Sequence, residues 1–180
     1  SASDPQTDFG RLESSAAWND DTTLWNDTAP TSSVITLGLS TEVNASGEPF
    51  IMYAFRSVPG VCKVGSYIGN GSSTVPPYVH LGFRPRFIMF KNATVARDWV
   101  ITDTARSPSN PAELFLFPNE EEAEAARGPA SGSDYDVDLL ADGFRPITGD
   151  SALNGTGNTI VYMAMADIGG NGTLPPIYGR

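Results

Sequence analysis

The sequence has a single cysteine, Cys62, and a single histidine, His80, among its 180 residues. One cysteine cannot form a disulfide within the chain, and a structural zinc site needs several cysteine or histidine ligands. A serine hydrolase triad would have to use His80, and the chain contains no Gly-x-Ser-x-Gly elbow. We interpret Cys62 as a small apolar filler and His80 as a hydrogen-bonded strand residue. We therefore predict no catalytic, metal-binding or cofactor-binding residues.

Long apolar runs are absent, and basic residues are few. No run reaches the roughly 18 apolar residues that a membrane-spanning helix needs. Eleven Lys and Arg residues stand against 21 Asp and Glu residues, which gives a formal net charge of −10. Such a surface repels phosphate backbones and anionic lipids, so we expect no nucleic-acid partner and no membrane insertion. The polar start Ser1–Pro5 lacks an initiator Met and a signal sequence, so we expect a processed chain or a piece of a longer one.

What the sequence does contain is a near-repeat at a spacing of 110 residues. Residues 44–55 align without a gap on residues 154–165, and each copy is an Asn/Gly turn followed by an apolar run. This pattern indicates a turn that leads into a buried strand. We predict a truncated first copy at 1–60 that packs on a complete second copy at 61–180. The leading strands of the first copy are missing, so we expect an unpaired edge that a neighbouring chain covers.

Short apolar runs between turn residues predict the fold. Eighteen glycines and 14 prolines interrupt the chain. The expected strands are 33–37, 50–55, 66–68, 78–81, 87–91, 98–103, 114–117, 137–140 and 159–165. We predict an all-β, antiparallel β-sandwich or jelly-roll-like fold, in which 87–91 and 98–103 pair as a hairpin. One short helix is expected at 120–127, with Asn119 as its cap and Gly128 as its stop.

Carboxylates and asparagines form two further patterns. Asp134, Asp136 and Asp138 alternate, so a strand would place them on one face, where they could hold calcium. No calcium-loop spacing accompanies them, and we interpret the row as a solvated strand face. Glycosylation sequons occur at Asn26, Asn44, Asn70, Asn92, Asn154 and Asn171. We interpret them as turn chemistry, because Asn and Ser or Thr beside Gly are what tight turns need.

Aromatic rings could form a platform for sugars, since flat rings stack on the apolar faces of pyranoses. Trp99 lies in an apolar run and is expected in the core. Trp18 and Trp25 lie in a polar segment and are therefore the candidates for a glycan-binding site. The competing interpretation, in which each tryptophan pins a loop to the sandwich, is the commoner case.

Several segments resemble a repeat of unnamed function in tail-fibre and other minor virion proteins of tailed bacteriophages. The matching segments are 66–71, 82–88, 99–106 and 154–165 in the second copy, and 25–34 and 44–55 in the first. Their order carries the resemblance, which departs from the usual pattern in lacking the first half of copy one. It implies a β-rich component of the virion surface, often within a longer fibre, and no catalytic residues.

We therefore expect a non-enzymatic virion structural protein, either a capsid decoration protein or part of a tail fibre. Its partners would be other copies of itself and other virion proteins, joined by buried strand edges and apolar surface. One alternative is a tail-fibre module that recognises host surface glycan through exposed aromatics. Another is a secreted, glycosylated β-sandwich protein. The weakest alternative is a glycan hydrolase that uses two carboxylates in a cleft.

Overall fold

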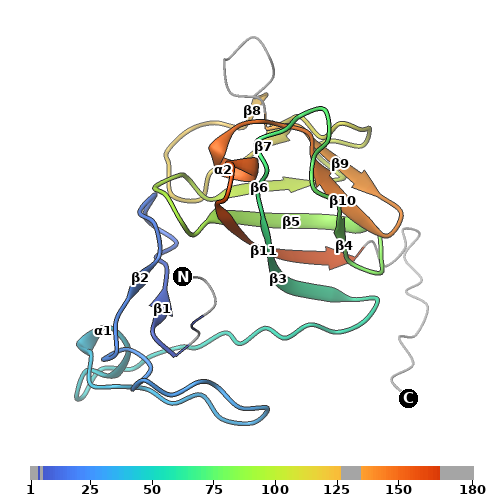
Figure 1. The fold of residues 1–180 in the computed structure, drawn as a ribbon. Coiled ribbons are helices and arrows are strands. Elements are labelled where there is room, and N and C mark those ends of the chain that lie inside the picture. Colours follow the sequence, from blue (N-terminus) through green and yellow to red (C-terminus); the bar gives the residue numbers. More distant parts are fainter. Residues whose placement is uncertain (1–3, 5, 127–134, 167–180) are drawn as a thin grey trace.

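The computed structural model describes residues 4, 6–126 and 135–166, which fold mostly as antiparallel β-structure with two four-residue helices (Figure 1). In chain order the elements are β1 (Asp8–Phe9), β2 (Asn19–Asp20), α1 (Thr41–Asn44), β3 (Cys62–Ile68), β4 (Val79–His80), β5 (Pro85–Asn92), β6 (Val100–Asp103), β7 (Leu114–Phe115), β8 (Ala125–Ala126), β9 (Val137–Leu140), β10 (Gly143–Pro146), α2 (Ser151–Asn154) and β11 (Thr159–Ala166).

Two antiparallel sheets make up the main body. The larger has the order β3-β11-β5-β6 and the smaller the order β4-β10-β9, while β1-β2 and β7-β8 form separate short pairs. The strand β11 is central, because it pairs with β3 on one edge and with β5 on the other. The predicted antiparallel, sandwich-like fold is confirmed, and so is the predicted hairpin, which is formed by β5 and β6.

The core lies between the facing sides of these two sheets. Phe144 of β10 is fully buried, and three aromatic rings contact it edge-on. The distances between ring centroids are 5.4 Å to Phe90, 5.3 Å to Tyr162 and 5.7 Å to Tyr67, which is only partly buried. Edge-to-face contacts of this kind add to the free energy gained by burying the rings. The Tyr67 hydroxyl donates to the carbonyl of Leu153 at 2.6 Å, and burial raises the pKa of Tyr67 well above its usual value.

Three predicted elements are not where the sequence places them. Residues 33–37 and 50–55 belong to no strand, because their backbone groups form no ladder with another described segment. The helix expected at 120–127 is also wrong. Asn119 accepts from the Trp99 amide at 2.8 Å and donates to Asp98 at 2.9 Å, so its side chain is not available as a cap. The chain turns there and continues extended into β8; Arg127 and Gly128 lie outside the described residues.

The two helices occur at matching positions 110 residues apart and share their local geometry. Ser40 caps α1 and Asp150 caps α2, each accepting from the amide two residues on. The side-chain amide of Asn44 donates to the carbonyl six residues earlier at 2.9 Å, and that of Asn154 does the same at 2.7 Å. A glycine with positive φ follows each helix. The likeness covers this motif and ends there, because only α2 leads into a strand. The division into two copies therefore stays a prediction.

Two of the five sequon asparagines that the structure describes are fully buried. Asn154 donates to the carbonyls of Ser72 and Thr148 and pairs with the Asn70 side chain and main chain. Asn92 donates to the carbonyl of Ser151 and accepts two turn amides. In this fold neither nitrogen is open to a glycosyl donor, and both side chains act as turn-forming groups. Asn171 and the first carboxylate of the predicted row, Asp134, lie outside the described residues.

Candidate functional site

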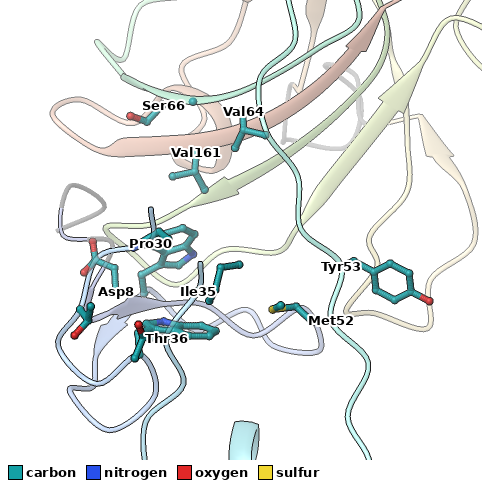
Figure 2. A pocket seen from close by; sticks show the side chains of 13 residues that line it. Asp8, Pro30, Ile35, Thr36, Met52, Tyr53, Val64, Ser66 and Val161 are labelled. Carbon is teal, nitrogen blue, oxygen red and sulfur yellow. The ribbon is translucent and has the colours of Figure 1, made fainter. Parts of the chain in front are cut away.

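A pocket of about 510 Å³ lies between the N-terminal part of the chain and the outer face of the larger sheet (Figure 2). Its lining consists of Asp8, Trp18, Trp25, Thr28, Pro30, Ile35, Thr36, Met52, Tyr53, Val64, Gly65, Ser66 and Val161. The pocket is thus built from segments far apart in the sequence. Most of the lining side chains are apolar, so the cavity suits an apolar or aromatic group better than a charged one.

One wall is the side of β3 and β11 that faces away from the core. Val161 of β11 is directly opposite Ser66 of β3, and residues two positions apart on a strand share a face. Val64 and Val161 therefore project toward the pocket (Figure 2), while Ile160 and Tyr162, which alternate with Val161, are buried in the core. The period-two pattern of these strands makes one face core and leaves the other for the pocket.

Trp18 and Trp25 form part of the opposite wall. The Trp18 amide donates to the carbonyl of Ala93 at 3.1 Å, which ties this segment to the end of β5. A Cβ on Gly10 would lie 2.3 Å from Trp18 Nε1, so only glycine lets the chain pass this close to the indole. Trp25 is held by a tight turn, in which Asn26 has a φ of 54°.

The structure therefore brings both predicted tryptophans to one pocket, but it does not present them as an exposed shelf. Both side chains are half-buried. Trp99, which the sequence places in the core, is also half-buried, and its Nε1 donates to the carbonyl of Arg11 at 2.8 Å. All three indoles thus lie where the N-terminal part of the chain meets the sheet, which agrees with the interpretation of tryptophans as loop anchors.

A buried lysine helps to fasten this N-terminal part. Lys91 of β5 has no exposed surface, and its ammonium group donates to the carbonyls of Ser15, Asn92 and Arg97 at 3.1, 3.1 and 2.8 Å. Burial lowers the pKa of Lys91 from 10.5 to about 8, against a smaller opposite effect of the Asp98 carboxylate. Sequence reasoning did not single out Lys91, although a lysine inside an apolar strand is the signal that could have found it.

The pocket lining contains few charged side chains. Asp8 is its single carboxylate; it is nearly buried, and it accepts from the Asp4 amide at 3.1 Å. His80 lies elsewhere, on β4, with its Nδ1 3.6 Å from Asp142 and most of its side chain exposed. Within the described residues, no three His, Cys, Asp or Glu side chains are grouped so that they could hold a metal ion. The pocket can therefore bind a group by shape and apolar contact.

Beside the pocket, a row of large apolar side chains faces solvent. The chain between α1 and β3 carries Phe50, Ile51, Met52, Tyr53 and Phe55, each at least 49% exposed. Figure 1 shows this connection, drawn in cyan, running along the outside of the molecule without joining a sheet. Met52 and Tyr53 also line the pocket, so the exposed row and the pocket form one continuous apolar surface. The strand that the sequence predicts at 50–55 is therefore absent from the described structure.

Fold and site together define a mostly β, sandwich-like module with an apolar pocket and an exposed apolar row beside it. The chain belongs to the family described as "Domain of unknown function (DUF7483)", whose sequence pattern matches residues 3–168. No curated protein and no solved structure matched the chain. None of the helices among the described residues has the length and apolar character that crossing a membrane requires.

Proposed function

We propose that this chain is a non-enzymatic structural protein of a phage virion, as a capsid decoration protein or part of a tail fibre. The observation that carries the proposal is the exposed apolar row at residues 50–55. Monomeric soluble proteins rarely leave so many adjacent large apolar side chains in water, and such surfaces mark sites of protein–protein contact. The resemblance of the sequence to repeats of phage minor virion proteins supplies the setting.

The physical role would be to join subunits by burying this surface between them. Burial stabilises an interface by roughly 25 cal/mol for each Å² of apolar surface removed from water, before the entropic cost of association. A net charge of −10 keeps free copies soluble and apart. Contact would then form mainly at high local concentration, as on a particle surface. The partners would be further copies of this chain and other virion proteins, and the protein would lie on the outside of the particle.

The test is immunogold electron microscopy on purified phage particles, with an antibody raised against this chain. Label over the head would identify a decoration protein, and label on the tail a fibre component. The control is the same antibody after adsorption on the purified chain, which should remove all label. Particles that carry no label, although the protein is detected in the same lysate, would refute the proposal.

The second candidate function is glycan recognition in a tail-fibre module, and the observation that favours it is that Trp18 and Trp25 line one pocket. Trp25→Ala should abolish binding to a host-surface glycan array, while Trp25→Phe should keep part of it because a ring remains for stacking. Trp99→Ala is the matched control, since Trp99 is half-buried but does not line the pocket. Equal binding by folded Trp25→Ala and wild-type protein would exclude this function.

A further inference from the structure

The exposed row 50–55 has the apolar composition of a central strand, but no strand among the described residues pairs with it. In a strand, Ile51, Tyr53 and Phe55 would share one face and Phe50 and Met52 the other. Both sets are open to solvent: the first three side chains are 83%, 79% and 58% exposed, and the other two are 49% and 60% exposed. The aligned run in the second copy, Ile160–Met165, belongs to β11 and has a strand on each edge. The run 160–165 is therefore paired on both edges, whereas the run 50–55 pairs with no described strand, although the same cap-helix-turn motif precedes each.

The neighbouring part of the chain does not supply the missing partner. A tight turn pairs Val58 with Cys62 and starts a hairpin toward the free edge of β3. The Ser57 hydroxyl then accepts from the Val64 amide at 3.1 Å and donates to its carbonyl at 3.2 Å. These are the groups that the next residue of a growing strand would use, so the hairpin stops there. The backbone of residues 49–55 makes no hydrogen bond to another described residue, so its groups are available to another chain.

We propose that residues 49–55 of two copies of this chain pair as antiparallel strands about a two-fold axis at Met52. The inference rests on the proposed structural function, because it names the surface through which copies would join. The charges at the two ends of the run argue for this arrangement. Glu48 precedes the row, Arg56 follows it, and both are exposed. Centred on Met52, antiparallel pairing places Glu48 of each copy opposite Arg56 of the other, twice in one dimer.

The alternatives to this register are less favourable. A parallel pairing would set Glu48 beside Glu48 and Arg56 beside Arg56, which destabilises by like-charge repulsion. A shift of the antiparallel register by two residues, in either direction, would leave Glu48 and Arg56 opposite uncharged side chains. In the proposed register Ile51 is opposite Tyr53, a β-branched and aromatic pair of the kind that stabilises sheets. Pro49, which has no amide proton, falls at the end of the ladder, where strands tolerate it.

Charge-swap variants of the full chain test the register. Sedimentation equilibrium should show a concentration-dependent dimer for the wild type. Glu48→Arg and Arg56→Glu should each weaken association roughly ten-fold, because each turns two attractive pairs into repulsive ones. The double variant should return to within about two-fold of the wild type. Glu121→Arg, which makes the same charge change at an exposed site away from the row, is the control and should not weaken association.

Cross-linking tests the axis directly. In a Cys62→Ser background, Met52→Cys should form a disulfide-linked dimer on copper–phenanthroline oxidation, because the two positions 52 face each other. Phe55→Cys should not, since the two positions 55 would be about 20 Å apart along the strands, well beyond disulfide reach. A chain that stays monomeric at all concentrations, or a dimer indifferent to the charge swaps and not cross-linked at 52, would overturn the pairing.

These results are separable from those of the functional proposal. Immunogold label on particles together with a monomeric chain in solution would reject the pairing and keep the virion function. A dimer with the predicted register and no label on particles would keep the pairing and reject the virion function.

Discussion

Replacing Lys91 by methionine should change how stability depends on pH. The folded protein lowers the pKa of Lys91 from 10.5 to about 8, so between these values the unfolded chain binds more protons than the folded one. The free energy of unfolding contributed by this lysine therefore rises with pH. From about pH 7 to about pH 9.5 the wild type should gain about 2 kcal/mol relative to Lys91→Met.

The assay is urea unfolding of both proteins at the two pH values, followed by tryptophan fluorescence. Tyr67 and Tyr162, whose pKa values are raised by burial, are present in both proteins, so their titration cancels in the difference. Lys91→Met also leaves the carbonyls of Ser15 and Arg97 without this donor, which lowers the stability of the variant at every pH. Only the change with pH tests the reasoning. A difference that stays constant between the two values would refute it.

Two further predictions concern the packing around the site. Asn154→Ala should lower the free energy of unfolding by about 3 kcal/mol, because it leaves several buried groups unpaired, while Asn44→Ala, at the matching exposed position, should cost less than about 1 kcal/mol; chemical denaturation of both variants measures the contrast. Phe144→Ala should cost about 3 to 5 kcal/mol through the cavity it leaves, and Phe55→Ala, on the exposed row, about 0.5 kcal/mol or less; similar thermal midpoints for these two variants would contradict the assigned core.

The predictable parts of the fold are those in which local pattern and tertiary environment agree. The run 87–91 is dense in apolar residues, lies between turn signals and became β5 in a hairpin with β6. The run 137–140 became β9 because alternating Val137 and Leu139 face the core. The helix prediction at 120–127 is wrong because there the local pattern and the tertiary environment disagree. Its capping and charge pattern is local, but the Asn119 side chain hydrogen-bonds to Trp99 and Asp98 from another part of the chain and therefore does not cap a helix.

The candidate site was only partly predictable. Trp18 and Trp25 stood out because large aromatics are unusual in a polar segment. The sequence does not show that they share one pocket with Val64 and Val161, because those residues come from strands that meet the tryptophans only after folding. Lys91 illustrates the same limit. Its position in an apolar strand was visible, but the carbonyls that hold its ammonium group belong to Ser15 and Arg97, which the fold brings to it.

What the sequence by itself determined is the alternation and the turns: which runs can be strands, which glycines and asparagines make the bends, and that β-structure dominates. The tertiary structure alone decided which of those runs acquired neighbours. Residues 50–55 and 160–165 align closely, yet 50–55 is exposed and pairs with no described strand, whereas 160–165 lies in the interior of a sheet. The physical reason is that a strand is stable only when its backbone groups are paired and its faces are covered, and both conditions depend on segments distant in the chain.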